Sequence, residues 1–261
     1  MRIPIYQVDA FTSKVFSGNP AAVCLLNDWI SDSMLQAIAA ENNLSETAFI
    51  VQKGDGFELR WFTPKTEVVL CGHATLASAY VLFELQKWPE KTVCFQTRKS
   101  GQLIVEKKDH LFEMDFPSRP PTCERSADTF REIIGDLTLK VFDSEEDMLV
   151  VVESEQSVRD LKPNLTALAG MHCRGLIVTA KGEKADFVSR FFAPAVGVPE
   201  DPVTGSAHCV LVPYWAGILK KDNLHALQVS ERGGELFCRD LGKRASIAGK
   251  AALYLEGTVS I

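Results

Sequence analysis

Three side chains that can give or take a proton lie beside unusual features of this sequence: Glu46, His73 and Asp201. Glu46 begins a strand-like segment, whereas His73 follows and Asp201 precedes a glycine that starts an apolar segment. Carboxylates and imidazoles are common general acids and bases in enzymes. A single Glu or His is more often solvated or structural. These three gain weight as catalytic candidates because two of them lie at similar helix starts.

Two segments are apolar on nearly every face, residues 72–88 and residues 205–219. A helix that is hydrophobic all round must be buried all round, so each segment is expected to form a core helix enclosed by a curved sheet. The first N–H groups of a helix have no intrahelical partner and lie at the positive end of its dipole. Gly72 and Gly205, the latter followed by Ser206, therefore predict sites for an anion such as a substrate carboxylate. The alternative is that both glycines only permit tight turns.

Similar residues precede the two apolar segments. Arg60-Trp61-Phe62-Thr63-Pro64 leads to the first, and Arg190-Phe191-Phe192-Ala193-Pro194 leads to the second. The arginines, like the two glycines, are separated by about 130 residues, half of the chain, which indicates an internal duplication. We therefore expect an N-terminal lobe of residues 1–117 and a C-terminal lobe of residues 118–261, divided where prolines cluster. The last strand is allowed to pack back onto the N-terminal lobe.

Most of the remaining sequence predicts short strands, several with alternating apolar and polar residues. Their close spacing favours antiparallel, meandering sheets over repeated strand–helix–strand units, so the expected fold class is α+β. One amphipathic helix is predicted over Ser31–Glu41, capped by Ser31 and with Met34, Leu35 and Ile38 on one side. The predicted strands include Ile3–Asp9, Ala21–Leu26, Thr47–Val51, Glu58–Phe62, Leu103–Lys107, Leu111–Phe116, Leu149–Glu153, Leu176–Ala180, Ala185–Phe191, Glu235–Arg239 and Ala251–Leu255.

The composition argues against several classes of protein. The 261 residues are 46% hydrophobic and carry a net charge of −6 without a basic stripe, so nucleic acid is not an expected partner. The longest apolar run, residues 209–219, is shorter than the about 20 residues needed to span a membrane. The N-terminal residues lack the apolar core of a signal peptide, so a cytoplasmic location is expected. Seven cysteines without a CxxC pair fit reduced thiols better than disulfides.

Six motifs follow one another along the chain: Asp9-Ala10-Phe11-Thr12, Gly18-Asn19-Pro20-Ala21-Ala22-Val23, Asn43-Leu44-Ser45-Glu46-Thr47-Ala48-Phe49, Phe62-Thr63-Pro64, Cys71-Gly72-His73-Ala74-Thr75 and Asp201-Pro202-Val203-Thr204-Gly205-Ser206-Ala207. This set resembles the phenazine-biosynthesis F (PhzF-like) family, from Val8 to about Val259. The resemblance implies two pseudo-symmetric lobes of the diaminopimelate epimerase fold. Each lobe would be a curved, mostly antiparallel sheet or barrel around a central helix, with the active site between the lobes.

The resemblance also implies an isomerase that needs neither a metal nor an organic cofactor and is commonly a homodimer. The family's proton-moving glutamate falls on Glu46, its histidine on His73 and its aspartate on Asp201. Its Gly-Ser pair falls on Gly205 and Ser206. A shielded carboxylate is suited to take and return one proton, while amides at the helix starts would hold the carboxylate of a small-molecule substrate.

One departure from the superfamily pattern concerns thiols. Diaminopimelate epimerase and its closest relatives use two cysteines as opposed acid and base, whereas here the two positions hold Cys71 and Thr204. Racemisation by two thiols is therefore not expected. Three other hypotheses stay open. They are a Cys71–His73 nucleophile, a zinc site formed by Cys71, His73, His208 and Cys209, and a small-molecule-binding or interaction protein that keeps the fold without catalysis.

Overall fold

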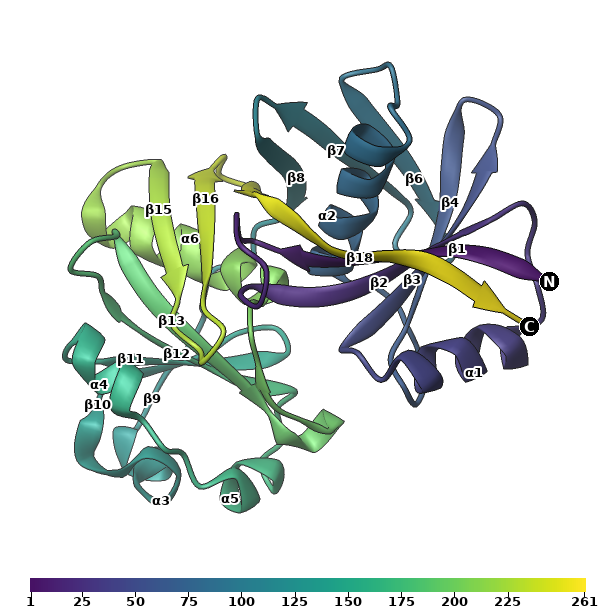
Figure 1. Ribbon diagram of the computed structural model, residues 1–261. Coiled ribbons are helices and arrows are strands. Elements are labelled where there is room, and N and C mark those ends of the chain that lie inside the picture. The colour runs from purple at the N-terminus through teal and green to yellow at the C-terminus, as the bar shows by residue number, and fades with distance from the viewer. The chain divides into compact units, whose positions relative to one another are not determined.

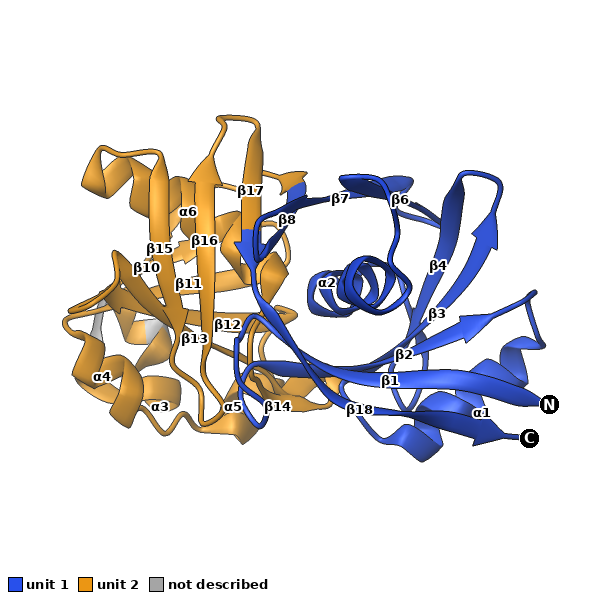
Figure 2. Ribbon diagram, turned by 45° about the horizontal axis from the view of Figure 1, so that its top comes forward, with its two compact units in different colours: residues 1–115, 248–261 blue, residues 116–247 orange. Residues whose placement is uncertain are grey.

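The computed structural model describes the backbone of residues 1–261 and the side chains of all residues except 129 and 137–139. The chain divides into two compact units (Figure 2): unit 1 consists of Met1–Asp115 and Ala248–Ile261, and unit 2 of Phe116–Ile247. The last strand, β18 (Ala251–Ser260), packs back onto unit 1, as the sequence analysis allowed, and pairs antiparallel with β1 (Arg2–Ala10). Both chain termini consequently lie side by side in unit 1 (Figure 1).

Unit 1 is a curved sheet around one helix, α2 (Gly72–Tyr80), which Figure 2 views nearly along its axis inside the strands. Its further strands are β2 (Asn19–Leu26), β3 (Glu46–Lys53), β4 (Gly56–Phe62), β5 (Glu67–Val68), β6 (Thr92–Thr97), β7 (Gln102–Lys108) and β8 (Leu111–Pro117). The pairs β2–β3 and β4–β6 are parallel. The pairs β1–β2, β3–β4, β4–β5, β6–β7 and β7–β8 are antiparallel.

Unit 2 has the same kind of sheet, packed on the central helix α6 (Gly205–Leu219). The strands are β9 (Glu124–Arg125), β10 (Thr138–Asp143), β11 (Asp147–Val152), β12 (Gly175–Lys181), β13 (Phe187–Ala193), β14 (Val198–Asp201), β15 (Asn223–Gln228), β16 (Gly234–Asp240) and β17 (Arg244–Gly249). From β10 to β16 the parallel and antiparallel pairings follow the order seen from β1 to β7. The short helices α3 (Arg131–Ile134), α4 (Glu155–Asp160) and α5 (Leu165–Ala169) pack on the outer side of this sheet.

The α+β class is confirmed, and both central helices are buried as their apolar sequences predict, except in the last turn of α6, where Ile218 is 57% exposed. Residues 73–79 of α2 are all buried, and α6 covers the predicted residues 205–219. The α-helical part of α2 ends at Tyr80 rather than Trp88, because the next turn, Val81–Leu85, is π-helical. No helix in the described part of the chain is long and apolar enough to cross a membrane.

Two polar groups of the buried helix α6, the Cys209 carbonyl and the His208 ring, have identifiable hydrogen-bond partners. Pro213 has no N–H to donate to the Cys209 carbonyl, and the backbone N–H of Arg119 donates to that carbonyl instead, at 2.9 Å. The fully buried His208 ring has its Nδ1 2.8 Å from the Thr204 carbonyl oxygen. Burial lowers the pKa of His208 to about 4, so the ring is neutral at pH 7 and Nδ1–H donates to this carbonyl.

The helix α1 (Asp32–Asn42) packs against strands β1 to β4 of unit 1. Ser31 caps it as predicted, since the Met34 N–H donates to the Ser31 Oγ at 3.3 Å. Leu35 and Ile38 are buried, whereas Met34 is 40% exposed and lies at the edge of this side. The buried stripe passes through Leu35 and Ile38, and Met34 lies about 100° before Leu35 around the helix.

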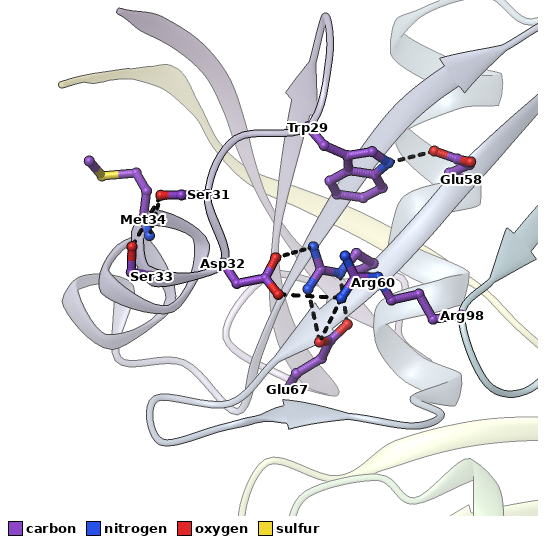
Figure 3. Close-up of polar contacts among 9 residues, drawn as sticks. All are labelled: Trp29, Ser31, Asp32, Ser33, Met34, Glu58, Arg60, Glu67 and Arg98. Carbon is purple, nitrogen blue, oxygen red and sulfur yellow. Dashed lines mark hydrogen bonds and ion pairs between the residues drawn. The ribbon is translucent and has the colours of Figure 1, made fainter.

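A buried arginine links α1 to two strands of unit 1 (Figure 3). Arg60, on β4, donates from Nε and Nη2 to the two Glu67 oxygens at 2.7 and 2.8 Å, and from Nη1 to Asp32 Oδ1 at 2.8 Å. Its guanidinium carbon lies 5.2 and 5.0 Å from the ring centroids of Trp29 and Phe62. Glu67 is on β5, shortly before α2, so this network fixes the chain as it approaches the helix.

Unit 2 contains a matching pair. Arg190, on β13, donates from Nε and Nη2 to the two oxygens of Glu200 at 2.7 and 2.8 Å. Its guanidinium carbon lies 4.8 Å from the ring centroid of Phe192, and its Nη1 donates to the Leu161 carbonyl at 2.7 Å. Glu200 is next to Asp201 on β14. The same kind of interaction therefore holds, in each unit, the segment that precedes the central helix.

Arg60→Met is expected to lower the free energy of unfolding by about 2 kcal/mol, because it removes the buried cation that two carboxylates share and leaves them only the exposed Arg98. The loss stays below the about 3–5 kcal/mol of a fully buried pair, since Glu67 and Asp32 are 29% and 62% exposed. The effect is measured by urea unfolding, with tryptophan fluorescence as the signal. Arg98→Gln is the matched control, since Arg98 approaches the same carboxylates at 3.4 and 3.6 Å but is 53% exposed. Equal losses in the two variants would contradict the role assigned to Arg60.

Neutral His208 is expected to make the protein less stable in acid. The unfolded chain protonates this imidazole near its ordinary pKa of 6.5, whereas the folded protein does so only at about 4. The contribution of neutral His208 to the free energy of unfolding is therefore complete above pH 6.5. It falls by up to about 3 kcal/mol as the pH decreases towards 4. His208→Asn keeps an N–H for the Thr204 carbonyl and should flatten this decline, as measured by urea unfolding at pH 7 and pH 4.5. The exposed His110, changed to Asn, serves as the control.

Candidate active site

Glu46 and His73 meet at the start of α2. Glu46 is the first residue of β3 and His73 the second residue of α2, and Glu46 Oε2 lies 3.0 Å from His73 Nε2. The two side chains are only 17% and 7% exposed. The contact brings together two of the side chains that the sequence analysis singled out for proton transfer.

Burial and the neighbouring groups have opposite effects on His73. Burial lowers the pKa of the imidazole, whereas the Cys71 sulfur and the Glu46 carboxylate raise it, and the resulting pKa lies well above the ordinary value. Burial, helped by the Glu46 charge, raises the pKa of Cys71 to about 11. This thiol is neutral at pH 7, so the Glu46 carboxylate is the charged neighbour that raises the pKa of the imidazole. A neutral thiol is a weak nucleophile, so the hypothesis of a Cys71–His73 nucleophile is disfavoured although Cys71 Sγ lies 3.6 Å from His73 Nδ1.

Asn19 joins this cluster and was not predicted as a site residue. It is fully buried, and its Nδ2 lies 3.2 Å from His73 Nδ1. A protonated ring donates from both nitrogens, so the amide then presents Oδ1 in place of Nδ2. The feature of the sequence that could have identified Asn19 is the preceding residue, Gly18. Its φ is +66°, and a Cβ added at this position would lie 2.1 Å from the Ala10 carbonyl oxygen. Only glycine permits that turn, which places Asn19 at the start of β2.

Asp201 ends β14, close to the start of α6 in unit 2. Thr204 Oγ1 donates to Asp201 Oδ2 at 2.5 Å. Gln228, on β15, accepts the Thr204 N–H at 2.8 Å and donates to the Asp201 carbonyl at 2.8 Å. The Thr204 hydroxyl, at the position that corresponds to Cys71, is thus committed to a carboxylate.

Ser206, in the first turn of α6, is bound by an arginine. Arg174 donates from Nη2 to Ser206 Oγ at 3.0 Å and from Nε to Asp147 Oδ1 at 2.9 Å. Asp147 is 3% exposed, so the pair holds a guanidinium firmly at the helix start. Sequence reasoning missed Arg174, Asp147 and Gln228, because they come from three separate segments and no local motif marks them.

The predicted site residues therefore form two clusters: Glu46, Gly72 and His73 in unit 1, and Asp201, Gly205 and Ser206 in unit 2. The residues that precede the two helices, Cys71 and Thr204, have extended backbones and form no side-chain cap on the first turn. The first-turn amides thus lack the usual side-chain acceptor, a condition that suits the predicted binding of a carboxylate.

One group of possible metal ligands occurs among the described residues: Glu46, Cys71 and His73, whose ligand atoms lie within 4.8 Å of one another. The zinc hypothesis also named His208 and Cys209, which belong to unit 2 and are not part of this group. Their Nδ1 and Sγ lie 2.8 and 3.7 Å from carbonyl oxygens of the preceding helical turn.

Three comparisons relate this chain to known proteins. An uncharacterized isomerase of Pseudomonas aeruginosa is 51% identical over 261 residues, with 100% of both chains covered. The crystal structure of a PhzF-family phenazine biosynthesis protein from Enterococcus faecalis has a TM-score of 0.97 at 43% identity and covers 100% of both chains. A predicted epimerase from Pseudomonas aeruginosa, with a TM-score of 0.80 at 19% identity and 99% of both chains covered, is similar in fold.

The family resemblance noted in the sequence is confirmed by a family model. The model described as phenazine biosynthesis-like protein, PhzC-PhzF, matches residues 8–257, nearly the whole chain. The relative and the crystal structure are likewise similar to this chain over their full lengths. The chain belongs to the phenazine biosynthesis-like (PhzC-PhzF) family.

Proposed function

We propose that this protein is an isomerase that moves a proton on a small carboxylate-bearing molecule, using acid–base catalysis without a metal or an organic cofactor. The observation that carries the proposal is the 3.0 Å contact between Glu46 Oε2 and His73 Nε2 at the start of α2. A carboxylate beside an imidazolium in largely buried surroundings provides a base and an acid for a proton shift. The relative that is 51% identical is named an isomerase, which supports the same class.

In this mechanism Glu46 takes the proton and returns it. Its carboxylate removes a proton from a substrate carbon whose C–H bond is acidified by conjugation or by a neighbouring carbonyl or amine. The electron pair of that bond is delocalised over the substrate, and Glu46 then gives the proton back to a different carbon or face. His73 stabilises the developing negative charge as a hydrogen-bond donor. The substrate gains and loses one proton, so no oxidant or reductant is required.

The remaining candidate residues bind the substrate in this proposal. The backbone N–H groups at Gly72 and at Gly205–Ser206 donate hydrogen bonds to the substrate carboxylate, since uncapped helix starts favour anions. Asp201 accepts a hydrogen bond from a substrate hydroxyl or amine. The proposal includes the homodimer implied by the resemblance, and no step of the proton transfer depends on it.

Glu46→Gln is expected to slow deuterium incorporation from D2O by about 100- to 10,000-fold, because it removes the base and keeps the size of the side chain. Wild type and variant are incubated in D2O with small amino, hydroxy and cyclic carboxylates, dihydro-hydroxyanthranilate included, and mass spectrometry reads the label. Glu41→Gln is the matched control, since Glu41 is exposed on α1.

Each outcome of this experiment has a distinct meaning. Label that appears equally with wild type and with Glu46→Gln would assign the base to another residue. If folded wild type labelled no compound of a broad set, the non-catalytic binding protein would become the better hypothesis. Label that is lost in Glu46→Gln and kept in Glu41→Gln supports the proposal and identifies the chemical class of the substrate.

A further inference from the structure

The cluster at the start of α2 contains a third chemical group that the proposed proton transfer does not use, the Cys71 thiol. Its Sγ lies 3.9 Å from His73 Nε2, and Glu46 Oε2 lies 3.0 Å from the same nitrogen. In tetrahedral zinc sites, bond lengths of about 2.0–2.3 Å place the ligand atoms roughly 3.3–3.7 Å apart. The two observed separations lie on either side of this range. Rotation about the Cα–Cβ bond of Cys71 moves the sulfur, so small side-chain adjustments suffice.

The chemical types of these three side chains indicate which metal ion they would bind. A thiolate, an imidazole and a carboxylate together suit Zn²⁺, whereas Mg²⁺ and Ca²⁺ prefer oxygen ligands. Three protein ligands also leave the fourth zinc position open for water. Asn19 contacts His73 Nδ1, so the ring is held with Nε2 towards Glu46.

Burial favours binding of a metal once it has entered. Cys71 and His73 are 6% and 5% exposed, so water competes little for the bound ion. Glu46, whose side chain is 17% exposed, is the most accessible of the three and is the natural first ligand for an ion that enters from solvent.

We propose that Glu46, Cys71 and His73 form a binding site for Zn²⁺ that inhibits the enzyme. On binding, the thiol and the imidazolium each release one proton to the solvent, and Zn²⁺ forms bonds to the sulfur, to Nε2 and to the carboxylate. The thiolate and the carboxylate balance the two positive charges of the ion. Glu46 then has its oxygen on the metal and cannot accept a substrate proton. Inhibition rests on the proposed function, whereas metal binding does not.

Cobalt titration of the full-length protein tests binding without any need for activity. Cys123→Ser is the background for all variants, because Cys123 is exposed and would bind metal by itself. One Co²⁺ per chain is expected, with a sulfur-to-cobalt charge-transfer band that one equivalent of Zn²⁺ abolishes and excess Mg²⁺ does not. Cys71→Ala should lose the band and weaken Zn²⁺ binding by more than the ~10–100-fold typical of outer-shell changes. Cys24→Ala, which alters another buried cysteine of unit 1, should keep both.

The outcomes separate the two proposals. No band in the background protein, or a band that persists in Cys71→Ala, overturns the zinc site. If Cys71→Ala does not fold, Cys71→Ser provides the same test, because a hydroxyl gives no thiolate band. Zn²⁺ that suppresses deuterium incorporation in the Cys24→Ala protein at one equivalent supports inhibition. A normal cobalt band with no deuterium incorporation by any variant would leave the metal site standing and count against the isomerase.

Discussion

Each unit depends on the enclosure of a helix that has no polar face. Such a helix cannot lie on one side of a flat sheet, because its other faces would remain in water, so the sheet must curve around it. In unit 1 the enclosure buries residues 73–79, and polar chemistry is confined to the helix start. The strands β2 and β3 are parallel neighbours that both begin beside this start. Their first residues, Asn19 and Glu46, therefore reach His73, and the enclosure itself assembles the site.

A polar group buried around the central helix destabilises the fold if it has no hydrogen-bond partner. Most buried polar side chains therefore form hydrogen bonds with the backbone or with one another. Thr75 and Ser78 donate to carbonyl oxygens one turn earlier in α2, at 2.6 and 2.7 Å, and the Trp215 indole donates to Thr179 at 3.0 Å. Such pairs are neutral and serve packing. The cluster of Glu46, Cys71 and His73 differs, because its members are titratable and contact one another. Groups of this kind, kept at a cost in desolvation, are typical of functional sites.

The sequence predicts the helices and strands, which depend on the pattern of neighbouring residues. It does not predict strand pairing or side-chain contacts between residues that are far apart in the chain. The central helices and most strands were predictable, because all-round apolarity and alternation are properties of neighbouring residues. Mostly antiparallel meanders were expected, but the sequence did not indicate that β2–β3 and β4–β6 would be the parallel pairs. A parallel pair needs a crossover, which α1 supplies for the first pair and the segment containing α2 for the second, and strand composition does not reveal such a path. The Arg174–Asp147–Ser206 contacts were unpredictable for the same reason, since three distant segments meet there.

The two helix starts have the same backbone conformation but different side chains. Cys71 has φ −143° and ψ 111°, and Thr204 has φ −119° and ψ 98°, so the same extended residue precedes the glycine in both units. This position demands only a backbone conformation, because neither side chain caps its helix. Thr204 donates to Asp201 and accepts from Gln228 at 3.1 Å, and these two hydrogen bonds fix the position of its hydroxyl. Under the proposed function, acid–base chemistry is therefore assigned to Glu46 and His73, the groups beside Cys71.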